Sequence, residues 1–205
     1  MMPILYFGGS FNPIHLGHLA LSRAVARAKG FGRVRLIISA DPPHKPRQSG
    51  RPIDLASAPD RLAMCHLAVA DDPLFQVDDL EFHRLGPSYT LDTVRELRRR
   101  DGLSANEAVY WLIGADSVAQ LPAWHLASTL VNEVDFVVVA RPGFQFDWMS
   151  LPEAFQKLEQ AVVEAPLVDI SATEIRRRVR AGESIEGLTT REVAEYIRER
   201  GLYGG

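Results

Sequence analysis

The sequence predicts an α/β fold in which helices cover both faces of a mostly parallel β-sheet. Short apolar runs of strand length alternate along the chain with segments in which apolar residues recur at helical spacing. Runs such as 109–113 and 136–140 are continuously apolar, which is typical of parallel strands buried on both faces. This alternation predicts one layered domain built around a central sheet.

The individual elements follow from these patterns in chain order. A first strand at 4–7 leads through a glycine-rich turn into a helix at 19–28. The further elements are a strand at 34–38, a helix at 60–70, a strand at 75–77, a helix at 91–100 whose start is marked by Thr90, strands at 109–113 and 135–140, and a helix from Ser171 to Arg180. Residues 40–58 contain several prolines and predict a long mobile loop, and long loops inside compact domains usually have a function.

Size and composition limit the class of protein. A chain of 205 residues with 46% hydrophobic content can bury a full core as a single domain, 1–205. A net charge of −3 argues against a general binder of nucleic acids or of membrane surfaces. The single cysteine, Cys65, cannot form an intramolecular disulfide and is expected to be a buried thiol. No segment resembles a signal peptide or a membrane span, so we expect a cytoplasmic protein.

Residues 8–18 place two imidazoles beside the glycine-rich turn that joins the first strand to the first helix. The first amides of a helix have no partner within the helix, so an anion there meets N–H donors and the positive end of the helix dipole. His15 and His18 add donors that can carry a proton near neutral pH. The turn is therefore a candidate phosphate site, and in an open α/β sheet it lies where ligands bind.

Spacing excludes two other phosphate-binding loops. The chain has no Gly-x-x-x-x-Gly-Lys-Ser/Thr, and Gly8, Gly9 and Gly17 do not fit the dinucleotide fingerprint. What remains is His-x-Gly-His preceded by Gly-Gly-Ser-Phe-x-Pro-x-His, which resembles the signature of the nucleotidyltransferase superfamily. The resemblance implies a Rossmann-like nucleotidyltransferase fold, in which such histidines hold the phosphates of ATP while its α-phosphate is attacked.

A second candidate phosphate site lies near the other end of the chain, at 170–176. Ser171 and Glu174 have the spacing of a capping box, so a helix should begin here. Alone, this pattern predicts a helix cap followed by a solvated basic face at 176–178. The resembled superfamily, however, has a Ser/Thr-rich element ending in Ile-Arg at this place. The resemblance implies that Ser171, Thr173 and Arg176 hold the β- and γ-phosphates, so that the helical part at about 170–205 completes the ATP site.

Three intermediate segments narrow the resemblance to one family. These are Pro42-Pro43-His44-Lys45, Ser88-Tyr89-Thr90-x-Asp92-Thr93, and Gly114-x-Asp116 with Trp124-His125. They are similar to segments of the bacterial nicotinate-nucleotide adenylyltransferases, and together with the two phosphate motifs they span nearly the whole chain. Two departures are Asn12, where the family commonly has aspartate, and Ala172, where many members have a second serine.

The resemblance implies a role for each group of residues. The implied catalytic residues are His15, His18, Lys45 and Arg176. The implied ATP-binding residues are Gly8, Gly9, Ser10, Phe11, His15, His18, Ile170, Ser171, Thr173 and Arg176. The implied residues for the acceptor nucleotide are Ser10, His44, Lys45, Tyr89, Thr90, Asp116, Trp124 and His125. Trp124 would stack on a pyridine ring, whereas Trp111 and Trp148 have no such context and are assigned to the core or the surface.

The implied reaction is adenylyl transfer from ATP to nicotinate mononucleotide, giving deamido-NAD and pyrophosphate. Such a reaction mainly requires that two polyanions be brought together and that charge on the transferring phosphate be stabilised. We find no carboxylate cluster spaced as a metal site, so Mg²⁺ is expected to arrive with ATP. The alternatives are another acceptor, either nicotinamide mononucleotide or phosphopantetheine, and a nucleotide-sensing module without turnover.

Overall fold

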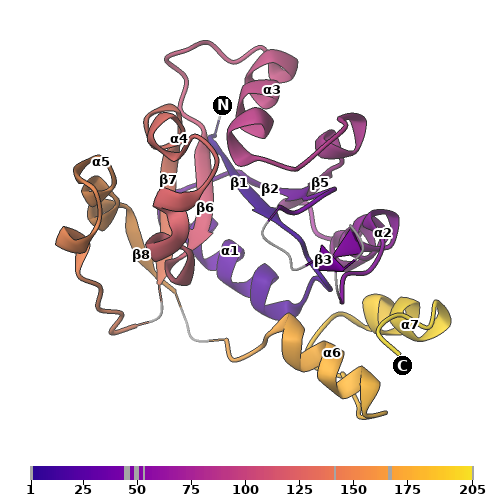
Figure 1. Cartoon of the computed structure of the whole chain (residues 1–205). Helices are drawn as coiled ribbons and strands as arrows, with labels where there is room; N and C mark the ends of the chain where they lie inside the picture. The colour runs from indigo at the N-terminus through magenta and orange to yellow at the C-terminus, as the bar shows by residue number, and fades with distance from the viewer. Residues whose placement is uncertain are drawn as a thin grey trace.

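The computed structural model describes residues 2–43, 47–48, 51–52, 54–140, 142–165 and 168–204. These residues form a six-stranded sheet in the order β5-β2-β1-β6-β7-β8, and every neighbouring pair in it is parallel. The strands are β1 (Ile4–Gly9), β2 (Arg33–Ile38), β5 (Phe75–Asp78), β6 (Tyr110–Gly114), β7 (Asp135–Ala140) and β8 (Val162–Glu164). The predicted α/β class and the mostly parallel sheet are confirmed (Figure 1).

Helices cover both faces of this sheet. The described helices are α1 (Leu16–Lys29), α2 (Ala58–Val69), α3 (Thr90–Asp101), α4 (Ala127–Glu133), α5 (Glu153–Gln156), α6 (Ala172–Arg180) and α7 (Arg191–Glu199). Short 3₁₀ helices occur at η1 (Leu80–His83), η2 (Ala115–Ala123), η3 (Trp148–Ser150) and η4 (Lys157–Ala161). Figure 1 shows α3 and α1 on opposite sides of β1.

Two hydrophobic cores explain this arrangement, because successive strand residues point to opposite faces. Trp111 and Ile113 of β6 pack into the core formed with α3 and α4. Leu112 lies between them in the sequence and packs into the other core, with α1, α2 and α7. The continuous apolar run at 109–113 is therefore the sequence of a strand that is buried on both sides.

The order of the strands places a crevice beside β1. From β1 the chain first builds β2 and β5 on one side, and then β6, β7 and β8 on the other. Ligands of open α/β sheets bind at such a reversal, beyond the carboxyl ends of the strands. The segment that follows β1 at this end is the glycine- and histidine-rich turn.

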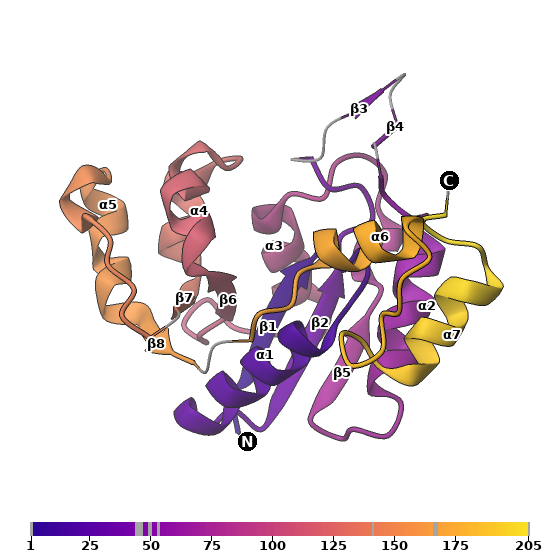
Figure 2. The same cartoon turned by 90° about the horizontal axis from the view of Figure 1, so that it is seen from below.

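The 40–58 segment is more regular than the sequence suggests. We expected a structureless loop, but its described residues include an antiparallel pair, β3 (Arg47–Gln48) with β4 (Arg51–Pro52). Figure 2 shows this pair extending away from the sheet. The pairing satisfies backbone groups that a long irregular loop would leave to water. His44 and Lys45, which the sequence assigns to substrate binding, lie outside the described residues.

The C-terminal segment returns to the first turn of the chain. The Thr189 hydroxyl donates to the Ile14 carbonyl over 2.9 Å, and the Leu16 amide donates to the Leu188 carbonyl over 3.0 Å. Helix α7 then packs on α2, and Figure 2 shows the two helices side by side. Cys65 on α2 is a buried free thiol, as expected. Across the described residues, no helix has the length and apolar character needed to cross a membrane.

Candidate active site

His15 and His18 form a reciprocal cap at the start of α1. His15 is the N-cap residue, and its Nδ1 atom accepts from the His18 amide over 3.3 Å. His18 Nδ1 accepts from the His15 amide over the same distance. The two rings are stacked, with centroids 3.6 Å apart and planes inclined by 25°. The capping of α1 therefore fixes the position of both imidazoles.

This cap also determines which ring nitrogen carries the proton. Because each Nδ1 accepts a backbone N–H, the neutral form of each ring has its proton on Nε2. Burial lowers the pKa of His15 to about 4. Burial and the adjacent His15 ring lower the pKa of His18 well below its usual value. With both pKa values lowered, the neutral rings present Nε2–H donors near neutral pH.

Glycine is required at two positions of the motif, where a side chain would collide with neighbouring groups. A Cβ atom on Gly17 would lie 2.9 Å from Nδ1 of His15 and 3.4 Å from the Ile170 carbonyl oxygen. On β1, a Cβ atom at Gly8 would lie 2.5 Å from the indole of Trp111. Both glycines therefore permit close contact, one beside the histidine pair and one between β1 and β6.

A cleft with a volume of about 560 Å³ opens beside the histidines. His15, His18 and Gly17 line it on one side, and Ile170 lines it from the segment before α6. Leu21 and residues at or after the ends of β6, β7 and β8 also line it: Ala115, Asp116, Val139, Ala140, Pro142, Gly143, Phe144, Ala165 and Val168. We call this the histidine cleft.

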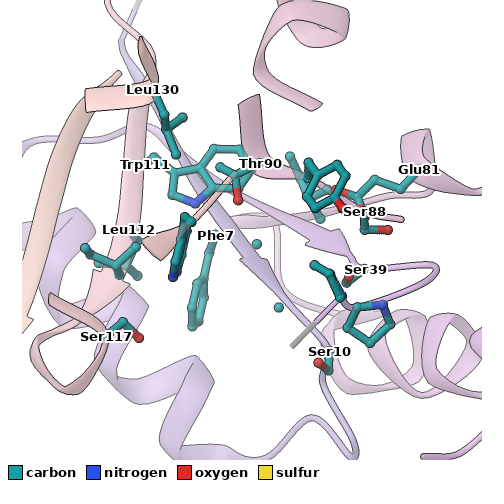
Figure 3. A pocket seen from close by; sticks show the side chains of 18 of the residues that line it. Phe7, Ser10, Ser39, Glu81, Ser88, Thr90, Trp111, Leu112, Ser117 and Leu130 are labelled. Atoms are coloured by element: carbon teal, nitrogen blue, oxygen red, sulfur yellow. The ribbon is translucent and has the colours of Figure 1, made fainter. Parts of the chain in front are cut away.

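A second cleft, with a volume of about 220 Å³, lies on the other side of β1 (Figure 3). It holds five predicted acceptor residues, namely Ser10, Tyr89, Thr90, Trp124 and His125. The Tyr89 and His125 rings are stacked, with centroids 4.1 Å apart and planes inclined by 22°. In Figure 3, Trp111 and Leu112 face Ser88 and Glu81 across the space. We call this the aromatic cleft.

The two clefts are neighbours. Phe7 and Gly114 line both of them. Phe7 also packs edge-on against His18, with ring centroids 5.9 Å apart. Two ligands, one in each cleft, would therefore meet next to the His15 and His18 rings.

The structure divides the predicted ATP and acceptor residues differently from the sequence. Gly8 and Gly9, assigned to ATP, line the aromatic cleft, whereas Asp116, assigned to the acceptor, lines the histidine cleft. The reason is local, because Asp116 lies in the first turn of η2 after β6, and η2 contacts β7. Phe11 packs behind His18, edge-on at 5.2 Å between ring centroids.

The second phosphate motif sits next to the first: Ile170 lines the histidine cleft, whereas Ser171, Thr173 and Arg176 line neither cleft in the described part of the chain. The Ser171 hydroxyl caps α6 by accepting from the Glu174 amide over 3.1 Å. The Glu174 carboxylate does not return this bond as in a capping box; it instead pairs with Arg177 and Arg178 at 2.8 Å. Arg176 donates from Nη1 to the Asn12 carbonyl over 2.8 Å and from Nη2 to the Thr173 hydroxyl over 3.3 Å.

Asn12 connects the turn after β1 with three other segments, namely residues 54–56, α6 and the C-terminal residues. Its side-chain amide donates to the Asp54 carbonyl over 2.6 Å, and its Oδ1 atom accepts from the Ala56 amide and the Tyr203 hydroxyl. A carboxylate could not donate to Asp54. The asparagine that departs from the resembled family's pattern therefore makes a hydrogen bond that needs an amide.

Sequence reasoning missed three residues beside the clefts. Trp111 was assigned to the core or surface, yet it lines the aromatic cleft with only 3% of its surface exposed. Arg61 and Glu81 are buried charged side chains, and Glu81 lines the same cleft. A charged residue inside a helical apolar pattern is a signal for such a role, but its partners are too distant in the sequence to be identified.

Comparisons with known proteins agree on one family. A model of the cytidylyltransferase-like family matches residues 6–178. A probable nicotinate-nucleotide adenylyltransferase from Serratia proteamaculans is 40% identical, with 96% of this chain and 93% of that protein covered. One from Herpetosiphon aurantiacus is 38% identical, with 99% of each chain covered.

A solved structure supports the same fold. Nicotinic acid mononucleotide adenylyltransferase from Plasmodium falciparum, complexed with NaAD, superposes with a TM-score of 0.74 at 20% identity. The superposition covers 99% of this chain and 98% of that one.

Proposed function

Because this chain belongs to the nicotinate-nucleotide adenylyltransferase family, we propose that its two clefts join ATP to nicotinate mononucleotide. An oxygen of the mononucleotide phosphate attacks the α-phosphorus of ATP. The bond from that phosphorus to the oxygen bridging to the β-phosphate breaks, so deamido-NAD forms and pyrophosphate leaves. The protein is an enzyme of NAD biosynthesis, and we expect it to act in the cytoplasm.

The observation that carries this proposal is the shared wall of the two clefts. Phe7 and Gly114 border both spaces, and the stacked histidines stand at the edge of one of them. An adenylyl transfer needs two polyanions held side by side with donors at the phosphorus between them. We assign ATP to the histidine cleft and the mononucleotide to the aromatic cleft.

The chemical task of the histidines is to donate from Nε2. Both Nδ1 atoms are occupied by backbone amides, so the Nε2–H groups are the donors each neutral ring can offer to phosphate oxygens. Donors fixed in place before the reaction stabilise charge that develops in the transition state without reorganising. The α1 cap holds the donors in this way.

Arg176 is proposed to bind the departing β- and γ-phosphates together with Ser171 and Thr173. Its guanidinium is held beside the motif turn by the Asn12 carbonyl and the Thr173 hydroxyl. Arginine suits this role because its planar donors match phosphate oxygens. Lys45 and His44 are proposed to reach the phosphates from the 40–58 segment, a role that rests on the family resemblance.

The aromatic cleft suits a pyridine carboxylate. The cleft contains the indole of Trp124 for stacking and the first residues of α3, Tyr89 and Thr90. The amides of a first helical turn attract an anion. A carboxylate can accept from donors of this kind, whereas a carboxamide offers an NH₂ to them on one side.

Mg²⁺ is proposed to enter with ATP. Among the described residues, no three His, Cys, Asp or Glu side chains gather closely enough to hold a metal ion. Asp116 is the carboxylate that lines the histidine cleft, so it is the protein group proposed to approach the ion. Magnesium commonly binds through substrate phosphates and one or two carboxylates, and it neutralises phosphate charge there.

The test is pyrophosphate release with ATP and a panel of acceptors, with each product identified by its mass. Nicotinate mononucleotide should exceed nicotinamide mononucleotide in kcat/KM by about 5- to 150-fold, the ratio expected when a buried polar group loses its partner. A preference for the amide or for phosphopantetheine would overturn the acceptor assignment. ATP binding without turnover on any acceptor would instead identify a nucleotide-sensing module.

A further inference from the structure

Arg61 of α2 is a fully buried arginine that binds backbone carbonyls. Its Nη1 atom donates to the Ser10 carbonyl over 2.8 Å and to the Ser39 carbonyl over 2.7 Å. Nη2 donates to Ala40 over 3.2 Å, and Nε donates to Ala56 over 3.1 Å. Its side chain has no exposed surface. One guanidinium thus joins the motif turn after β1, the end of β2 and the segment before α2.

Glu81 approaches the same region from the opposite side. Its side chain is buried, and Oε2 accepts from the Ala40 amide over 3.3 Å. Oε1 lies 2.5 Å from the Thr93 hydroxyl, which in turn lies 3.1 Å from the Tyr89 carbonyl. The Ser88 hydroxyl is a further hydrogen-bond partner of Glu81. Glu81 therefore connects the end of β2 to the start of α3.

The two charged groups hold one short segment between them, 39–41. Arg61 binds the carbonyls of Ser39 and Ala40, and Glu81 binds the amide of Ala40. A backbone hydrogen bond also holds the end of this segment, because the Ser88 amide donates to the Asp41 carbonyl over 2.9 Å. The Asp41 amide donates to the Ser88 hydroxyl over 3.0 Å.

This segment forms part of the aromatic cleft. Ser39, Pro42 and Pro43 line it beside Ser88, and Ser10 lines it from the motif turn. Figure 3 shows Ser39 between Ser10 and Ser88 at the side of the cleft opposite Leu112. Ser10 and Ser39, whose carbonyls Arg61 binds, and Ser88, a partner of Glu81, therefore form one wall of the cleft.

We propose that Arg61 and Glu81 are positioning residues that set the shape of the aromatic cleft and so determine how well it binds the acceptor mononucleotide. The inference deepens the proposed function and rests on it. Neither residue is assigned to the reacting phosphates. Arg61 does not line the cleft and acts through Ser10 and the 39–41 segment, whereas Glu81 lines the cleft itself and also holds the 39–41 segment and the start of α3.

The residue types fit this task. A guanidinium has five donors in a rigid fork, so it can bind four carbonyls at once, whereas a lysine ammonium presents three donors at one point. A carboxylate accepts from several donors at once, whereas a glutamine amide replaces one accepting oxygen with a donor. Arg61→Lys therefore keeps the charge and Glu81→Gln keeps the size, while each variant loses hydrogen bonds that hold the 39–41 segment.

The experiment measures steady-state kinetics with each substrate varied in turn. Arg61→Lys and Glu81→Gln should each raise the KM for nicotinate mononucleotide at least about tenfold, as expected for the loss of a hydrogen bond to a charged group. The KM for ATP should change less than about twofold, because the histidine cleft keeps its wall. In the double variant, the increase in the KM for nicotinate mononucleotide should be smaller than the product of the two single increases, because both residues hold the same segment.

Arg98→Lys is the matched control. Arg98 also binds backbone carbonyls, of Ser104 and Glu107 in the loop after α3 and of Glu133 at the end of α4, and none of these four described residues lines either cleft. Its loss should lower stability without changing either KM. An increase in acceptor KM with Arg98→Lys would show that general loosening of the fold explains the effect and would overturn the proposal.

Melting curves accompany each variant. Should Arg61→Lys fail to fold, Glu81→Gln decides the question alone, because it preserves shape and removes one accepting oxygen. Unchanged acceptor KM in a folded Glu81→Gln protein, or equal changes in both KM values, would overturn the positioning role. Failure of the proposed function is a different result, in which the wild-type protein releases no pyrophosphate with nicotinate mononucleotide.

Discussion

At the level of single residues, the histidine pair is proposed to bind phosphate through neutral side chains, because both pKa values are lowered. Each imidazole is buried, and burial favours the neutral form. The reciprocal cap occupies both Nδ1 atoms, so neutral rings still present N–H groups. The pair offers directed donors, and the positive charge must come from other groups such as Arg176.

The first prediction concerns His18. His18→Ala removes a fixed donor near the transferring phosphate, and loss of one such donor commonly costs about 2.7–4 kcal/mol of transition-state stabilisation. We expect kcat to fall at least about 100-fold, whereas the loss of one capping hydrogen bond of α1 should lower the free energy of unfolding by only about 0.5–2 kcal/mol. His66→Ala, at an exposed position on α2, is the control. A His18→Ala protein that keeps more than a tenth of the activity would contradict the role.

The second prediction concerns pH and stability. The pKa of His15 is about 4 in the folded protein and about 6.5 in an unfolded chain, so the unfolded state binds the proton more readily. Its contribution to the free energy of unfolding is complete above pH 6.5. This contribution is lost progressively as pH falls to about 4, and the total loss is roughly 3 kcal/mol.

Urea unfolding at pH 7 and pH 4.5 measures this effect. His15→Asn keeps an acceptor at the N-cap but cannot titrate, so it should lose less stability over this interval than the wild-type protein. The carboxylates that titrate in the same range are common to both proteins and cancel in the comparison. Identical losses in the two proteins would show that His15 titrates normally in the fold.

At the level of elements, the sequence predicts the strands and helices that are long or strongly patterned. The runs at 4–7, 34–38, 75–77 and 135–140 lie within strands, the run at 109–113 starts one residue before β6, and the hydroxyl cap at Ser171 begins α6 as expected. Short elements were missed, including β8 at one edge of the sheet and α4. These depend on packing against β7 and α3, which local sequence does not encode.

The candidate site follows the same division. Tyr89, Thr90, Trp124 and His125 were placed together by the family resemblance, and the structure brings them into one cleft. Arg61 could not be connected with Ser10 in this way, because the two are 51 positions apart and only the fold brings them together. Asp116 lines the histidine cleft and not the cleft of the other acceptor residues, for a related reason. The turn after β6 decides which cleft it faces, and spacing alone does not reveal that turn.

The third prediction tests how closely α1 and the segment before α6 approach. A Cβ atom on Gly17 would displace the His15 ring, from which it would lie 2.9 Å away, so Gly17→Ala should lower kcat/KM for ATP at least about tenfold. The melting temperature should change little, because alanine favours the helix by about 1 kcal/mol over glycine.

Ala20→Gly is the reciprocal control for Gly17→Ala. Ala20 is exposed on the same helix, so this change should lower stability by about 1 kcal/mol and leave the kinetics unchanged. Full activity in Gly17→Ala would mean that the ring can shift without consequence.

At the level of the whole molecule, the C-terminal segment meets the turn after β1 at the candidate site. The Tyr203 hydroxyl donates to Asn12 Oδ1 over 2.7 Å, across 191 positions of sequence. Tyr196 donates to Asp60 over 2.9 Å, which fixes α7 to α2. The same Asn12 residue offers its carbonyl to Arg176. The C-terminal segment is therefore positioned to hold the second phosphate motif beside the first.

The fourth prediction asks whether this segment folds with the sheet. If 1–205 is one domain, the protein should unfold in a single cooperative transition. Tyr203→Phe should then lower the free energy of unfolding by about 0.5–1.5 kcal/mol, the net value of one hydrogen bond. Circular dichroism in urea measures the transition, and hydrogen exchange in peptides from 188–204 follows the segment directly. Tyr110→Phe, at the opposite end of β6, controls for the loss of any tyrosine hydroxyl.

A separate early transition for the C-terminal peptides in the wild-type protein would show that α6 and α7 form an independent unit. In that case ATP binding should stabilise this unit more than the sheet, because Arg176 would be ordered by the ligand rather than by the Asn12 carbonyl.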